Sequence, residues 1–169
     1  MSEKLSSSEV KKLPFAVLSR IINKAKKYLE TDDAWLTVCK EHDISPDIIY
    51  LIPTAFANID TSAKTDHGVV LLSWKLLCNP DIHDVNAYLS HEYTHWVQQC
   101  LSNHATKGSD DGEYLNNRYE QEAFSNQVSY IDEHKGENAA ENYVDNLIEY
   151  HEVPKSDKKE IKDVLMSKV

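Results

Sequence analysis

The stretch His91-Glu92-Tyr93-Thr94-His95 determines how the rest of this 169-residue chain is read. It places two histidines four residues apart, with a glutamate directly after the first. On an α-helix, side chains with this spacing share a face about one turn apart. Both imidazoles can therefore bind one metal ion at the roughly 2.0–2.1 Å of a Zn–N bond. Glu92 lies about 100° further round the helix, beside the ion, where it can hold a water molecule and act as general base.

A catalytic zinc ion takes three protein ligands and keeps one position for water, so the histidines need a partner. The downstream candidates are His104, Glu120 and Glu122. Glu120 shares a helical face with the apolar residues Phe124 and Val128, whereas Glu122 lies roughly 200° away on a polar face. An inward carboxylate is costly to bury without a partner, and a metal ion supplies one. The predicted Zn²⁺ ligands are therefore His91, His95 and Glu120.

These two segments resemble the zincin metallopeptidases, and among them the gluzincins. In that family H-E-x-x-H on one helix is followed by E-x-x-A-[D/N] on the next, and Glu120-Gln121-Glu122-Ala123 is similar to the first four positions. Phe124 departs from the last position, where the family has a polar residue that steadies a ligand histidine. Asn126 or Glu122 is a possible substitute. The metzincin extension is excluded, because Gln98 and Leu101 occupy its glycine and third histidine positions.

The resemblance implies an α+β fold, a mostly helical zincin-like domain with a small β-sheet and an active-site helix that carries the motif. It also implies a zinc-dependent peptidase that hydrolyses a peptide or protein substrate, either generally or as a processing factor for one partner. The alternative is a zincin-fold metal-binding structural or assembly protein without peptidase activity. The intact Glu92 argues against this alternative, because a structural site needs no base.

In zincins an edge strand before the motif helix pairs with the substrate backbone. The segment from Gly68 to Leu72 lies where that strand is expected, although an ordinary core strand fits equally well. Several other residues are candidates for stabilising an oxyanion, although a surface or core role is commoner for each. They are His67, His134, His151, Tyr114 and Tyr119.

Apolar residues at three- to four-residue spacing predict several helices. In the N-terminal half we expect a helix over 10–29 with Pro14 in its first turn, a helix to His42 capped by Asp32 or Asp33, and a short helical turn at Ser45-Pro46-Asp47. The motif helix is expected to be capped by Asn79 or Asp84 and to end near Ser102. After it we expect a helix over 117–134 ended by Gly136, a helix from Asn138 to before Pro154, and a last helix capped by Ser156. Residues 48–57 are expected to be extended, and residues 58–66 and 104–112 to form loops.

The composition indicates a single domain over 9–169 after a polar, disordered lead over 1–8. Apolar residues make up 41% of the chain, which is enough for a core. The net charge of −10 and the lack of a long basic run argue against binding to nucleic acid or an anionic membrane. No signal peptide or membrane span is apparent. Cys39, Cys78 and Cys100 lack C-x-x-C spacing and are expected to be free and buried, so we expect a cytoplasmic protein.

Overall fold

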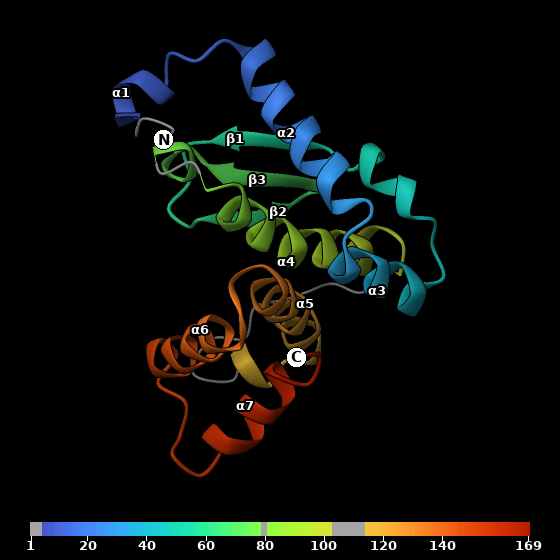
Figure 1. Cartoon of the computed structure of the whole chain (residues 1–169), viewed down its shortest axis with the longest axis vertical. Coiled ribbons are helices and arrows are strands. Elements are labelled where there is room, and N and C mark those ends of the chain that lie inside the picture. Colours follow the sequence, from blue (N-terminus) through green and yellow to red (C-terminus); the bar gives the residue numbers. More distant parts are fainter. Residues whose placement is uncertain (1–4, 79–80, 103–113) are drawn as a thin grey trace.

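Helix α4 (Ile82–Cys100), which carries the motif, lies between a three-stranded sheet and the C-terminal helices (Figure 1). The structure is a computed structural model that describes residues 5–78, 81–102 and 114–169. Within these residues the fold is α+β and mostly helical, as predicted. The other α-helices are α1 (Ser7–Val10), α2 (Phe15–Leu29), α3 (Asp33–His42), α5 (Arg118–Lys135), α6 (Glu137–Tyr150) and α7 (Lys158–Leu165). Short 3₁₀ helices are η1 (Pro46–Leu51), η2 (Trp74–Cys78) and η3 (Tyr114–Asn116).

The sheet has the strand order β1-β3-β2, so β3 (Val69–Ser73) is the central strand. It pairs in parallel with β1 (Thr54–Ala57) and antiparallel with β2 (Ala63–Asp66). The expectation that Gly68 to Leu72 forms the substrate-pairing edge is therefore wrong, and its alternative, a core strand, is what the structure has. The edge strand that packs against α4 is β2.

Strand β2 falls in the segment that was expected to be a loop. Its sequence Ala-Lys-Thr-Asp is polar and shows no clear alternation, so periodicity could not reveal it. His67 and Gly68 connect it to β3, and both have positive φ angles, 49° and 77°. Two such residues form the tight turn that matches the twist of a β-hairpin, and glycine adopts it without steric cost.

Pro14 divides the long N-terminal helix that was expected over 10–29. It takes the N-cap position of α2 with ψ of 145°, and Leu13 before it lies outside both helices. The physical reason is the proline ring, which disfavours helical geometry in the preceding residue. Of the expected disordered lead, residues 1–4 lie outside the described part of the chain. Ser7 and Ser8 belong to α1, which Ser6 and Glu9 start with a capping box.

Polar side chains start the helices that shape the site. Asp32, one of the two expected residues, caps α3. Asn117 caps α5, which begins close to where it was expected. Helix α4 is capped by Asp81, which accepts a hydrogen bond from the His83 amide, so the expected cap at Asp84 is wrong. Asn79 lies outside the described residues. Gly136, with φ of 90°, ends α5 as predicted. Helix α7 follows Asp157 instead of Ser156.

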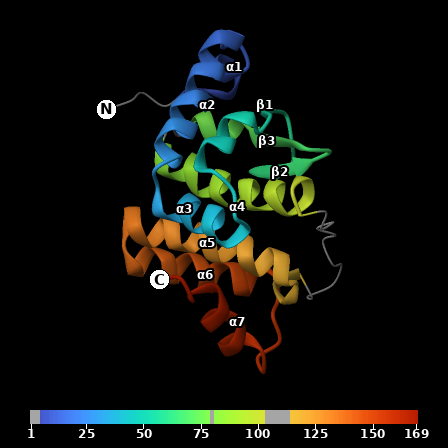
Figure 2. The same ribbon diagram turned by 90° about the vertical axis from the view of Figure 1, so that its right-hand side faces the viewer.

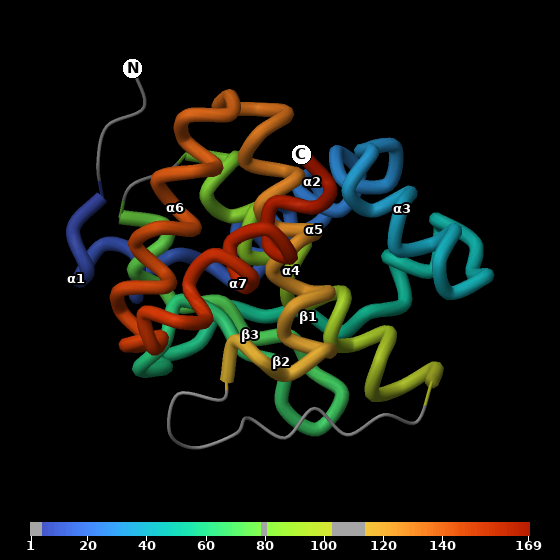
Figure 3. Tube along the Cα trace, turned by 90° about the horizontal axis from the view of Figure 1, so that it is seen from below, coloured from blue at the N-terminus to red at the C-terminus, as the bar shows by residue number. Residues whose placement is uncertain are grey.

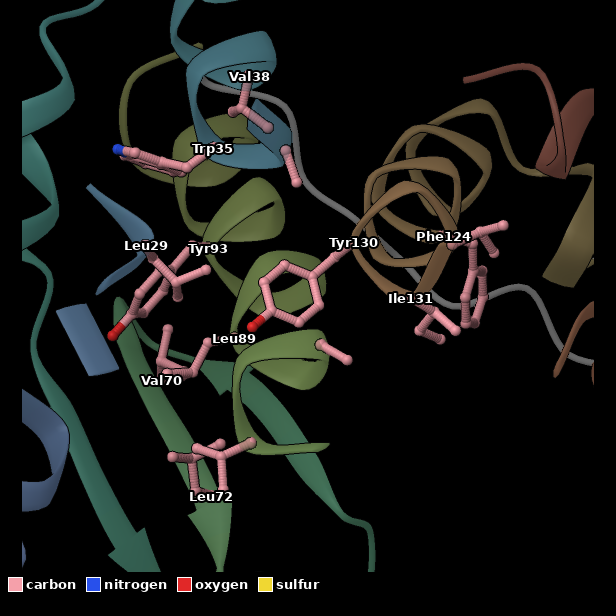
Figure 4. Close-up of a cluster of buried hydrophobic side chains, with 14 of the residues drawn as sticks. Leu29, Trp35, Val38, Val70, Leu72, Leu89, Tyr93, Phe124, Tyr130 and Ile131 are labelled. Carbon is pink, nitrogen blue, oxygen red and sulfur yellow. The ribbon is translucent and has the colours of Figure 1, made fainter. Parts of the chain in front are cut away.

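Both sides of α4 pack into the hydrophobic core, as Figure 4 shows. On the sheet side, Tyr93 of α4 lies among Leu29, Trp35 and Val70, and its ring centroid is 6.1 Å from that of Trp35. Helix α5 packs on the opposite side, with α6 and α7 beyond it (Figure 2). Seen from below, α7 lies in front of α5 and α6 lies beside it (Figure 3). The motif helix is therefore enclosed for most of its length.

The cysteines only partly match the expectation. All three are free, but Cys39 is buried, Cys78 is half-buried and Cys100 is exposed at the end of α4. Cys100 is on the last turn of its helix, where the flanking elements no longer cover it. Within the described residues, no helix has both the length and the apolar character needed to cross a bilayer.

Candidate metal centre

The structure brings His91, His95 and Glu120 together from two adjacent helices. The Nε2 atoms of the two histidines are 3.0 Å apart. Glu120 Oε2 lies 3.1 Å from Nε2 of His95 and 3.4 Å from Nε2 of His91. All three residues are buried, at 5–6% exposure, although each is polar. Their three ligand atoms therefore form a nearly regular triangle.

The dimensions of this triangle fit a zinc ion. Two ligand atoms that are each about 2.0–2.1 Å from an ion at tetrahedral angles lie roughly 3.3–3.4 Å apart. The three observed separations of 3.0, 3.1 and 3.4 Å are close to this value. Two imidazole nitrogens and a carboxylate oxygen are also a donor set that zinc prefers. The residues present therefore fit the ion that the sequence predicts.

Without a metal, the cluster is a coupled group of charges. Burial alone would raise the pKa of Glu120, but hydrogen bonds from His91 and His95 and their charges outweigh it and lower the pKa. Burial likewise acts to lower the pKa of His95, but the Glu120 carboxylate opposes it and raises the pKa. The carboxylate is thus held ionised, which is the form that binds a cation.

A hydrogen-bond chain fixes which nitrogen of His95 faces the triangle. Gln98 Nε2 donates to the Tyr119 carbonyl at 3.1 Å and to Glu122 Oε2 at 2.7 Å, so its Oε1 is left to face His95. Nδ1 of His95 lies 2.8 Å from that oxygen and must donate to it. In the neutral ring, Nε2 then carries the lone pair and points to the triangle, as a metal ligand requires.

Glu122 is more buried than its position on the α5 helix predicted. It was expected on a polar, outward face, yet its side chain is only 23% exposed and bonds to Gln98 and to His42 Nε2. Helix α3 packs against α5 and covers this side, which a single-helix projection cannot anticipate. Of the two suggested substitutes, Glu122 supports a ligand histidine, through Gln98. Asn126 instead donates to Thr94 Oγ1 and accepts from Lys168 Nζ.

Because Phe124 stands where the gluzincin-like motif has a polar residue, it gives His91 no hydrogen-bond partner. Its ring packs edge-to-face on His91, with centroids 4.3 Å apart. Nδ1 of His91 is buried and has no hydrogen-bond partner among the described residues. A polar residue at 124 would stand where a partner is needed. One ligand histidine is therefore supported by hydrogen bonds and the other by packing alone.

Glu92 lies next to the ligand set without belonging to it. Thr65 of β2 places its hydroxyl 2.7 Å from Glu92 Oε2 and 3.0 Å from the Glu92 carbonyl oxygen. Trp96 Nε1 donates to the carbonyl oxygen of Gly68 at 3.1 Å and so fixes the β2–β3 turn on α4. The hairpin thus positions the carboxylate that the sequence assigns as general base. Thr65 gave no signal in the sequence, although the Asp66-His67-Gly68-Val69 turn could have revealed β2.

Of the five oxyanion candidates, the structure places Tyr114 and His151 near the ligands. Their rings stack with centroids 4.9 Å apart, and Tyr114 also packs on Phe124. Burial, then the charge and hydrogen bonding of Glu120, raises the pKa of Tyr114. Burial lowers the pKa of His151.

The remaining three oxyanion candidates are engaged elsewhere. They bond as follows: His67 to Asp66, His134 to Asp32, and Tyr119 to Arg118. The third-ligand candidate His104 lies outside the described residues.

A second group with ligand atoms close together is Asp32, Glu133 and His134. Asp32 caps α3 with one oxygen and bonds to His134 Nε2 with the other, at 2.6 Å. The ring of His83 stacks on His134 at 4.8 Å. Both oxygens of Asp32 already have partners, so we interpret this group as a structural connection between α3 and α5.

Comparison of the chain with protein-family models, curated proteins and solved structures returned no match.

Proposed function

We propose that this chain is a zinc-dependent metallopeptidase of the zincin type, similar to the gluzincins, that hydrolyses peptide bonds in a peptide or protein substrate. The observation that supports it most is the triangle of His91, His95 and Glu120 with Glu92 beside it, held by β2. The free cysteines suit a reducing compartment, and we extend the proposal to the cytoplasm.

The three ligands would hold Zn²⁺, which when bound supplies a Lewis acid for the scissile carbonyl and lowers the pKa of water. The chain's own residues do the rest. Glu92 accepts the proton of the attacking water and delivers it to the departing amine. Thr65 keeps the Glu92 carboxylate oriented, because its hydroxyl hydrogen-bonds to one carboxylate oxygen. We assign the donors to developing negative charge on the carbonyl oxygen to Tyr114 and His151, whose rings stack near the ligands.

Strand β2 also supports the proposal. It is an edge strand that packs on the motif helix, and its residues Lys64 and Asp66 are exposed. A free strand edge offers a row of backbone donors and acceptors to an extended peptide. The role that the resemblance assigns to a strand before the motif thus passes from β3 to β2.

The test is zinc content together with peptide cleavage by the wild type and a Glu92→Gln variant. We expect close to one zinc per chain in both proteins, and cleavage only by the wild type, because the change removes the base and keeps the ligands. If neither protein binds zinc, the proposal fails. If both bind zinc and neither cleaves any peptide, the alternative of a structural or assembly protein with a metal site is correct.

A further inference from the structure

A cavity of about 460 Å³ opens between α4, α5 and α6, outside the ligand set. Ligand-binding pockets in proteins are usually of roughly 300–1,000 Å³, so it is large enough for a substantial group. None of the proposed catalytic residues lines it. Its lining includes Tyr88 of α4, Gln127 of α5 and Tyr143 of α6.

The cavity lies along the same faces of α4 and α5 as the candidate metal centre. On α4, Asp84 and Tyr88 line the cavity, and they precede His91 by seven and three residues, which is the spacing of one helical face. On α5, Gln127 and Ile131 line it and follow Glu120 by seven and eleven residues, again on one face. The α4 wall therefore begins about one turn from His91, and the α5 wall about two turns from Glu120.

The chemistry of the walls favours a large apolar group. Tyr88, Tyr143 and Ile131 supply ring and aliphatic surface, and aromatic rings pack well in edge-to-face or offset geometry. Gln127 is 2% exposed and forms a hydrogen bond with Tyr143, so these two polar groups already have a partner within the protein.

Charge at the cavity opposes a basic group. Two lysines, Lys75 and Lys135, line it with a single carboxylate, Asp84. Lys135 Nζ binds Asp84 and also Asp81, at 3.1 Å. Lys75 is exposed and forms no ion pair within the described part of the chain, and Asp84 is already bound by Lys135, so a basic side chain finds no free carboxylate in the cavity.

We propose that this cavity binds a large apolar side chain of the substrate, an aromatic one above all, next to the bond that is cleaved. The proposal rests on the proposed peptidase function and adds the substrate class to it. Cleavage is then directed to bonds that neighbour Phe, Tyr or a comparable residue, and Lys or Arg at that position is rejected.

Two small residues, Ala87 of α4 and Ala139 of α6, leave the space open. Ala139 is half-buried on the cavity side of α6, so a larger side chain there can point into the cavity. The Ala139→Trp variant fills the space, and Ala139→Leu narrows it with less disturbance of packing. Ala16→Trp on the exposed surface of α2 is the matched control for adding a tryptophan.

The experiment uses decapeptides of Ala, Ser and Gly in which one Phe is moved along the sequence one position at a time. With zinc-loaded wild type, we expect the cleaved bond to move with the Phe at a fixed offset. Replacement of Phe by Ala or Lys should lower kcat/KM by at least about 10-fold. Ala139→Trp, and to a smaller extent Ala139→Leu, should remove this preference, whereas Ala16→Trp should keep it.

A binding measurement separates failure of the cavity assignment from failure of the proposed function. The Phe and Ala decapeptides are titrated against the Glu92→Gln variant, alone and combined with Ala139→Trp, with far-UV circular dichroism to confirm folding. Tighter binding of the Phe peptide that Ala139→Trp abolishes supports the cavity assignment even if no peptide is cleaved. Equal binding of both peptides, or cleavage at positions unrelated to Phe, would overturn it.

Discussion

Gln98 decides which nitrogen of His95 is free for a metal ion, although it is not one of the three predicted ligands. Its amide is oriented by two acceptors, Glu122 and the Tyr119 carbonyl, and so presents an oxygen to His95 Nδ1. His91 has no such support, because Phe124 packs where a polar partner would stand. The two histidines of the motif are therefore not equivalent, and their supporting residues should differ in effect.

Replacing Gln98 by leucine should weaken zinc binding by roughly 10–100-fold, the usual cost of losing a residue that orients a ligand histidine. The change removes the acceptor for His95 Nδ1, so the ring is free to adopt the wrong tautomer. Zinc affinity measured by competition with a chromophoric chelator checks this. Glu122→Gln is the control, because an amide oxygen can still accept from Gln98. Wild-type affinity in Gln98→Leu would show that the chain of hydrogen bonds does not orient the ligand.

Thr65→Val should lower kcat for peptide cleavage and leave zinc affinity unchanged. Valine keeps the shape of threonine but removes the hydroxyl that contacts Glu92 Oε2. A hydrogen bond to a charged group contributes about 1.5–3 kcal/mol, so we expect a loss of roughly 10-fold or more in kcat. Thr65→Ser should restore most of it. A Thr65→Val enzyme with normal kcat would mean that Glu92 needs no support from β2.

At this scale the sequence predicts what depends on one helix and misses what depends on two elements. His91, Glu92 and His95 are specified by their spacing, and Glu120 by the apolar face that it shares with Phe124. Thr65 and the contact between Gln98 and Glu122 arise from packing between elements. Projection of one helix carries no information on its neighbours, which is why Glu122 was expected to face outward.

At the scale of elements, helix starts and turns are encoded locally, whereas strand β2 is not. The side chains of Asp32 and Asn117 accept hydrogen bonds from the first backbone amides of their helices, and so mark helix starts. Gly136 marks a helix end, because glycine adopts a positive φ angle without steric cost. Strand β2 is polar and short, and it becomes a strand through pairing with β3 and packing on α4. Its contribution to the site could only be seen once the hairpin was placed.

Asn117→Ala tests whether a helix start positions a ligand. Asn117 Oδ1 accepts from the amides of Tyr119 and Glu120, at 2.9 and 3.4 Å, so it fixes the turn that presents Glu120. We expect a loss of about 1 kcal/mol in the free energy of unfolding and weaker zinc binding. Asp81→Ala removes the cap of α4, ten residues before His91, and should lower stability without a change in zinc affinity. Chemical denaturation and metal titration of both variants make the comparison.

At the scale of the molecule, the candidate metal centre lies between α4, which packs on the sheet, and the C-terminal helices, which begin with α5. Helix α4 packs on the sheet with one side and on α5 with the other (Figure 1). The histidines come from α4 and the glutamate from α5, so a bound ion would connect the two layers. Sequence reasoning found both helices but not this arrangement, because the order of layers depends on long-range packing.

Zinc should therefore stabilise the whole fold, and not only the site. An ion that binds only the folded state adds about 2.7 kcal/mol at a free concentration of 100 Kd. For a chain of 169 residues, 1 kcal/mol corresponds to roughly 2–4 °C in Tm, so saturation to that level should raise Tm by roughly 5–11 °C. The measurement is calorimetric Tm with added zinc and after removal of metal by a chelator. His95→Ala should show no zinc-dependent shift, because two ligands remain in a site that needs three. A Tm that does not change with zinc in the wild type would contradict a site built across α4 and α5, since any ion bound there must favour the packed state.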